Sequence, residues 1–73
     1  MPVVEIQLLA GRDKALHERL IARVTDAVVE TLGVKPEKTI VLLHEVAREH
    51  WGVAGVPRTD PLPVPPEPTN EGR

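Results

Sequence analysis

The spacing of apolar residues changes twice along this chain, and that change is the strongest constraint on its fold. Residues 3–9 alternate in character, which is the period of a β-strand with two different faces. From about residue 13 to 32, apolar residues recur every three or four positions, as in an amphipathic helix. Residues 39–46 are β-branched or apolar at nearly every position, which indicates a second strand buried on both faces. This order predicts an α+β fold made of a single βαβ unit, with two parallel strands and one helix.

Residues that commonly begin and end helices flank the expected helix. Asp13 precedes the helical period, and we expect its carboxylate to accept hydrogen bonds from the first helical amides. Gly33 follows the last apolar position and suits the left-handed conformation that closes many helices, and Pro36 prevents the helix from resuming. The expected apolar stripe consists of Leu16, Leu20, Val24, Ala27 and Thr31, widened by Ile21, Val28 and Leu32.

The last third of the chain differs in composition from the rest. Residues 48–55 contain the spaced glycines of a turn or a short hairpin. Six of the eight prolines follow residue 56, in a polar segment that cannot bury a core. We therefore expect a βαβ domain at 1–55 and a proline-rich, flexible C-terminal tail at 56–73.

The expected domain is near the lower size limit for a chain that is stable alone. The 73-residue chain has no Cys, Phe or Tyr, and Trp51 is its single aromatic residue. Domains this small usually depend on disulfides, a metal ion or oligomerisation. Disulfides are excluded, and His17, His44 and His50 lack the spacing of a metal site. We therefore predict a metal-free chain that associates with other copies.

Charge and hydropathy argue against several classes of partner. The nine basic and eleven acidic residues are interspersed and give a net charge of −2, so no basic surface for nucleic acid is expected. No apolar run has the length of a membrane span, and the first residues do not have the pattern of a signal peptide. Together with the absence of Cys, this favours a cytoplasmic protein.

Pro2 directly follows the initiator Met1. A small second residue favours removal of Met1, which would expose a secondary amine at the start of the first strand. An ordinary α-amino group has a pKa of about 8, and burial in an apolar site lowers the pKa of an amine by disfavouring its protonated form. Such an amine is an effective general base near neutral pH. If Met1 is retained, the nitrogen is an amide, and Pro2 is simply the inert first residue of an edge strand.

Residues 2–55 resemble the 4-oxalocrotonate tautomerase family. The resemblance lies in Pro2 and its short strand, "GR" at 11–12, the amphipathic helix, the second strand, and "HWGVAG" at 50–55. It implies that the amino-terminal proline moves a proton between carbons of an unsaturated 2-keto acid, with no cofactor. It also implies single βαβ subunits that assemble, commonly as hexamers, with active sites at subunit boundaries.

The resemblance also assigns roles to particular residues. Pro2 matches the catalytic base, and Arg12 matches the arginine that binds a substrate carboxylate. Leu9 matches a position whose backbone amide faces the substrate, and Trp51 matches an aromatic residue that walls the pocket. The chain departs from the family at Ile40, where a second arginine usually binds the keto acid. This departure puts activity on the usual diacid substrate in question.

We therefore expect an isomerase, a keto–enol or allylic tautomerase of small unsaturated carboxylic acids. One alternative is a hydratase, dehalogenase or decarboxylase on the same scaffold. Another is a weakly active subunit of a hetero-oligomer, in which a sister chain supplies the arginine missing at Ile40. A third is a non-enzymatic binding module, in which the tail segment "PLPVPP" recruits a partner. We expect a homo-oligomer, with a hexamer favoured and a hetero-oligomer as the alternative.

Overall fold

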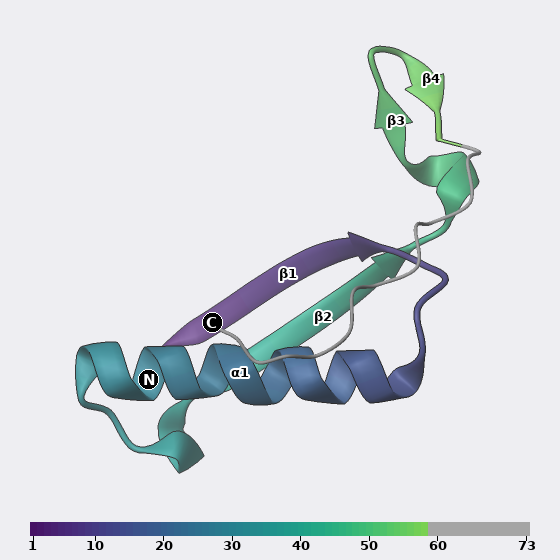
Figure 1. Ribbon diagram of the computed structural model, residues 1–73. Coiled ribbons are helices and arrows are strands. Elements are labelled where there is room, and N and C mark those ends of the chain that lie inside the picture. Colours follow the sequence, from purple (N-terminus) through teal and green to yellow (C-terminus); the bar gives the residue numbers. More distant parts are fainter. Residues whose placement is uncertain (59–73) are drawn as a thin grey trace.

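The structure is a computed structural model that describes residues 1–58. The remainder of the predicted tail, residues 59–73, lies outside the described part. The elements follow the order β1 (Val3–Leu9), α1 (Lys14–Leu32), a 3-10 turn (Pro36–Lys38), β2 (Ile40–Val46), a second 3-10 turn (Arg48–His50), β3 (Gly52–Val53) and β4 (Val56–Pro57) (Figure 1).

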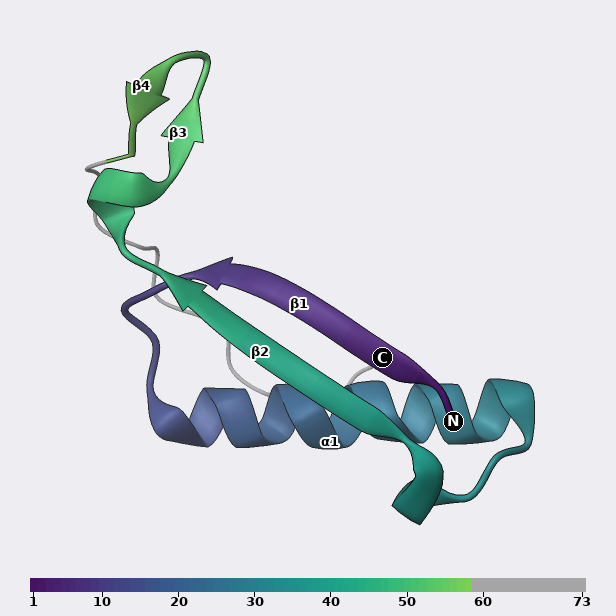
Figure 2. The ribbon, with the colours of Figure 1, turned by 180° about the vertical axis from the view of Figure 1, so that it is seen from behind.

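Strands β1 and β2 form a two-stranded parallel sheet, and α1 lies along one face of it (Figures 1 and 2). The register pairs Val3 with Ile40 at one end and Leu9 with Val46 at the other. The βαβ unit with two parallel strands and one helix is therefore confirmed. Because the strands are parallel, their first residues share one end of the sheet, the amino end, and their last residues share the other, the carboxyl end.

The two ends of α1 differ in how well they match the sequence prediction. Gly33 has φ 70°, and its amide donates to the Val29 carbonyl at 2.9 Å, as expected of a left-handed cap. Asp13 occupies the N-cap position, but its carboxylate makes no capping hydrogen bond. Instead its backbone carbonyl accepts from the amides of Leu16 and His17, at 3.1 and 3.3 Å. The prediction that the Asp13 side chain caps the helix was therefore wrong.

The face of α1 that packs on the sheet is narrower than the predicted stripe. Its half-buried apolar residues are Leu16, Leu20, Val24, Val28 and Val29. Most of these follow steps of four residues, which places them in one row along the helix. Ile21, Ala27, Thr31 and Leu32, which belong to the predicted stripe, are exposed instead.

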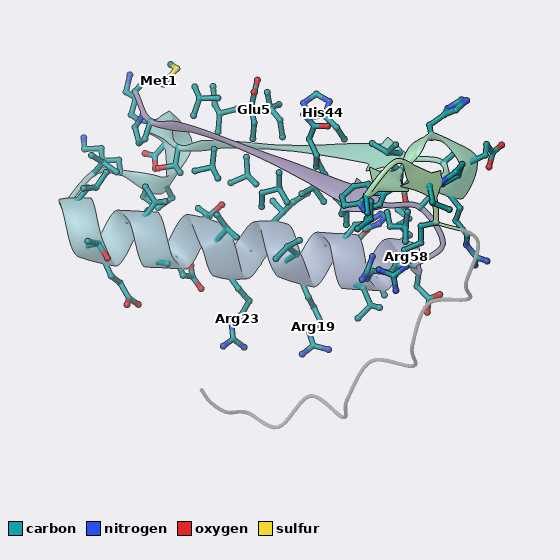
Figure 3. The ribbon with its side chains drawn as sticks, turned by 90° about the horizontal axis from the view of Figure 1, so that it is seen from above. Met1, Glu5, Arg19, Arg23, His44 and Arg58 are labelled. Atoms are coloured by element: carbon teal, nitrogen blue, oxygen red, sulfur yellow. The ribbon has the colours of Figure 1, made fainter. Side chains whose placement is uncertain are left out.

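The face of the sheet opposite α1 is uncovered within one chain. Val3, Ile40 and Leu42 are 53%, 37% and 39% exposed on this face. Glu5 and His44 point the same way, away from the helix (Figure 3). Within a single chain β2 is therefore covered on one face only, and burial of its second face, which its apolar sequence predicts, would require another copy of the chain.

Burial within the described residues is very limited. Leu9, 5% exposed, is the one residue of 1–58 that is fully buried, and α1 contributes none. A core of this size does not offset the conformational entropy lost when a domain folds. This limited burial agrees with the expectation that the chain associates with other copies, which would cover its exposed apolar residues.

Beyond β2, the chain forms the small hairpin expected from its glycines. β3 and β4 pair in antiparallel fashion across Ala54 and Gly55, which have φ values of 55° and 82°. Positive φ at both central residues is typical of the tight turns that join two strands. The hairpin projects beyond the carboxyl end of the sheet (Figure 1) and includes Val56 and Pro57, so ordered backbone continues past residue 55.

Candidate active site

Pro2 lies at the amino end of the sheet, immediately before β1. Its carbonyl accepts a hydrogen bond of 3.0 Å from the Ile40 amide, so it joins the ladder between the two strands. Pro2 is half-buried, whereas Met1 before it is 79% exposed. While Met1 is attached, the Pro2 nitrogen is an amide. A Met1 that projects into solvent makes little contact that its removal would disturb.

Arg12 lies at the carboxyl end, in the short connection from β1 to α1. The connection begins with the Ala10 amide, which donates to the Val46 carbonyl at 2.8 Å, and turns at Gly11 with φ 125°. Arg12 is exposed, and its Nη1 donates to the Leu9 carbonyl at 3.1 Å. This bond uses one of five guanidinium N–H donors, so the fork is oriented while most of its capacity to bind a carboxylate remains.

Leu9 has a buried side chain and backbone groups that point outward. The Pro2 carbonyl and the Ala10 amide both bond to β2, so even-numbered residues of β1 direct their backbone groups toward the partner strand. Successive residues of a strand alternate in this respect, so the Leu9 amide points to the open edge of the sheet. The Leu9 carbonyl points the same way, and it is the group that accepts from Arg12 Nη1.

Trp51 anchors the hairpin at the same end of the sheet. Its amide donates to the Arg48 carbonyl at 3.1 Å, and its carbonyl accepts from the Arg58 amide at 2.8 Å. The residue is half-buried, so part of the indole remains available to pack against another molecule. Leu9, Arg12 and Trp51 thus share the carboxyl end.

The predicted site residues divide into two groups that a single chain does not bring together. Pro2 and Ile40 share the amino end of the sheet, and the other three share the carboxyl end. Seven steps of strand at about 3.3 Å each place Pro2 about 23 Å from Leu9. A small acid cannot contact both groups of one chain.

One polar pair near the carboxyl end was not anticipated. His17 of α1 places its Nε2 3.1 Å from Glu45 Oε2 of β2, with side chains 20% and 44% exposed. The atoms are close but not aligned for a hydrogen bond. No spacing in the sequence signals a pair this far apart along the chain. Within residues 1–58, no third potential metal ligand joins this pair to form a metal site.

Comparison with known proteins gives consistent results. The model of the tautomerase enzyme family matches residues 2–60. A probable tautomerase of Halalkalibacterium halodurans is 46% identical over 55 residues, which cover 75% of this chain and 90% of the relative. A solved structure of the 4-oxalocrotonate tautomerase isozymes from Methylibium petroleiphilum has a TM-score of 0.74 at 38% identity, covering 77% of this chain and 88% of that one.

A more distant structure has the same architecture. A heterohexamer 4-oxalocrotonate tautomerase from Chloroflexus aurantiacus has a TM-score of 0.75 at 24% identity, covering 78% of this chain and 92% of the other. At this identity the similarity concerns the fold.

The chain is thus a small βαβ protein with the same fold as the 4-oxalocrotonate tautomerase homologues. It belongs to the tautomerase family. In the described part of the chain, no helix has the length and apolar character needed to cross a membrane.

Proposed function

We propose that this protein is an isomerase that moves a proton within a small unsaturated 2-keto or enol acid, with Pro2 as the general base. The observation that carries the proposal is that the family match begins at Pro2, the residue immediately before β1. Removal of Met1 would turn its nitrogen into a secondary amine. The proposal needs no metal ion or cofactor.

The proposed reaction is a balanced proton transfer. The Pro2 nitrogen accepts the proton of the enol O–H, and the electron pair of that bond forms the C2 carbonyl. As the carbonyl forms, the electron pair of the C2–C3 double bond shifts to C3, and C3 takes the proton from the prolinium. Arg12 would hold the substrate carboxylate, the Leu9 amide would face the substrate, and Trp51 would exclude water from the amine.

We further propose that each active site combines residues from different copies of the chain. Pro2 of one subunit would lie beside Arg12, Leu9 and Trp51 of another, since about 23 Å separates these groups within one chain. The uncovered sheet face and the scarcity of buried residues support self-association. A cytoplasmic homo-hexamer is the assembly that we favour from the family resemblance.

The direct test is a Pro2→Ala variant assayed with 2-hydroxymuconate and phenylenolpyruvate, after intact-mass spectrometry has shown which residue begins the mature chain. Loss of a general base should lower kcat by about 10²- to 10⁴-fold. A matched pair of tagged proteins provides the control. A tag before Pro2 converts its nitrogen to an amide and should abolish activity, whereas the same tag after Arg73 should not. Undiminished activity in Pro2→Ala would refute the role of the proline.

The pH dependence separates this function from other reactions on the same scaffold. A base must be deprotonated, so tautomerase activity should rise with pH until the Pro2 amine has lost its proton. A hydratase or decarboxylase that uses a cationic Pro2 as acid should instead lose activity over that range. The rate should be followed in the mature protein, with Pro2→Ala as the reference for residues that titrate elsewhere.

A second candidate is a subunit of a hetero-oligomeric tautomerase. Ile40 favours it, because a sister chain could supply an arginine at the position equivalent to this one. Purification from the native source, followed by native mass spectrometry, distinguishes the two assemblies. A single subunit mass supports the homo-oligomer, and a second chain in fixed ratio supports the hetero-oligomer.

A further inference from the structure

We infer that His17 is a positioning residue for Arg12. When His17 is protonated, its charge-assisted contact with Glu45 holds the start of α1 against β2, and this fixes the place from which Arg12 reaches a carboxylate. The inference rests on the proposed function, because its consequence is a change in how tightly the substrate carboxylate is bound.

The connection that carries Arg12 is attached to β2 at its first residue. The Ala10 amide donates to the Val46 carbonyl at 2.8 Å. Gly11, with φ 125°, has no Cβ to restrict the backbone that follows. The direction of Arg12 therefore also depends on where α1 begins.

The start of α1 is not fixed by a side-chain cap. The Asp13 carboxylate makes no capping hydrogen bond, and the Asp13 carbonyl accepts from the His17 amide at 3.3 Å. A contact made by the His17 side chain therefore restrains the residue that immediately follows Arg12.

The contact between His17 and Glu45 provides this restraint. The Nε2 atom of His17 is buried without an aligned hydrogen bond, and Glu45 Oε2 lies 3.1 Å from it. Glu45 directly precedes Val46, so both ends of the connection are held by the last two residues of β2. Among residues 1–58, this is the one polar side-chain contact that joins α1 to the sheet.

The other charged groups around the first turn of α1 are exposed to solvent. Asp13 is exposed, and Lys14 and Glu18 pair with each other at 3.9 Å with side chains 89% and 67% exposed. Glu45 is therefore the charged group that faces His17 from the sheet. The half-buried residues that β1 directs toward the helix do not titrate: Val4, Ile6 and Leu8.

Protonation strengthens this contact. A carboxylate only accepts hydrogen bonds, so Nε2 must carry a proton to bond with it. A neutral histidine can place its one proton on either nitrogen, whereas the cation carries both and forms a stronger, charge-assisted bond. Histidine is the side chain that ordinarily changes charge between about pH 5 and 8, so the restraint on Arg12 should weaken as pH rises.

The experiment measures kcat and KM of the mature protein for phenylenolpyruvate. His17→Gln should raise KM by about two- to tenfold, the factor that corresponds to one intramolecular hydrogen bond. It should leave kcat nearly unchanged, because the proton is moved by Pro2. His17→Lys keeps the cation and should retain the wild-type KM. Between about pH 5 and 8, the wild-type KM should rise relative to that of His17→Lys, and this ratio cancels the titration of Pro2.

Matched variants show whether the effect belongs to the pair. Glu45→Gln should raise KM as His17→Gln does, and the double variant should be no worse than either single one. Glu18→Gln breaks the exposed ion pair in the same part of α1 and should leave KM unchanged. Native mass spectrometry checks the assembly. If His17→Gln does not assemble, the pH comparison of the wild-type protein with His17→Lys decides the question.

The outcomes are distinct. An unchanged KM in His17→Gln, alongside a raised KM in Arg12→Gln, would overturn this inference and leave the proposed function standing. Additive losses in the double variant, or a KM ratio to His17→Lys that is constant with pH, would also overturn it. An unchanged KM in Arg12→Gln, or full activity of Pro2→Ala, would instead overturn the proposed function.

Discussion

Arg12 is held in place by the strand that it follows. The bond from its Nη1 to the Leu9 carbonyl fixes the direction of an otherwise flexible side chain at the carboxyl end of the sheet. A pre-oriented guanidinium loses less side-chain entropy when it binds a carboxylate, so its contribution to affinity is larger. This local contact pre-orients an exposed arginine, as the role proposed for Arg12 requires.

We predict that Arg12→Gln lowers kcat/KM by about 10- to 100-fold, mainly through KM, because it removes a charge-assisted contact with the substrate carboxylate. Steady-state kinetics with either acid measures this effect. Arg19→Gln is the matched control, since Arg19 projects from α1 away from the sheet (Figure 3). Equal losses in both variants would indicate a general effect of charge rather than binding by Arg12.

Ala54 adopts an unfavourable backbone conformation in the hairpin turn. Its φ of 55° is left-handed, which costs a residue with a Cβ about 1–2 kcal/mol relative to glycine. Ala54→Gly should therefore stabilise the hairpin by up to about 1 kcal/mol, once the extra flexibility of glycine in the unfolded chain is included. Hydrogen exchange of the Val56 and Arg58 amides measures this change.

At an ordinary helical position, the same change from alanine to glycine should be destabilising. Ala22 is exposed in the middle of α1, where a change to glycine should cost about 1 kcal/mol. If Ala54→Gly is also destabilising, the turn does not have the geometry described here.

At the scale of elements, the two termini of α1 differ in capping: Gly33 caps the C-terminus, whereas no side chain caps the N-terminus. The Asp13 carboxylate makes no capping bond, so Asp13→Ala should change the free energy of unfolding by less than about 0.5 kcal/mol, compared with about 1 for a working cap. Gly33→Ala should cost about 1 kcal/mol or more, because φ is 70° and the added Cβ meets no neighbouring atom that would compensate. Thermal unfolding at one fixed protein concentration compares the two, and a larger loss for Asp13→Ala would contradict the prediction.

The period of the apolar residues was sufficient to predict both long strands and the helix, because each period belongs to one backbone geometry. The same pattern could not show that Asp13 leaves the helix amides uncapped, since capping depends on side-chain direction as well as residue type. Nor could it show left-handed Ala54, because alanine rarely adopts that conformation. The candidate site residues were assigned from the family resemblance. The sheet register then showed which of them lie at the same end of the sheet.

At the scale of the whole molecule, the uncovered sheet face should determine assembly. Leu42→Glu places a charge among Val3 and Ile40, where another copy would have to bury it, so we predict dissociation into smaller species and loss of activity. Native mass spectrometry or sedimentation measures the change. Ala22→Glu, which adds the same charge at an exposed position on α1, should leave the assembly intact. If the Leu42→Glu protein keeps the wild-type mass, the face is not an interface.

The separation of Pro2 from Arg12 along β1 also implies that two defective proteins can repair one another. Pro2→Ala and Arg12→Ala chains, each impaired alone, should recover activity when they are co-expressed or refolded as a mixture, measured as kcat/KM. With random mixing in equal amounts, about a quarter of the sites would receive an intact proline from one chain and an intact arginine from another. Such complementation is impossible for an enzyme whose catalytic groups all come from one polypeptide, so its absence would show that each chain works by itself.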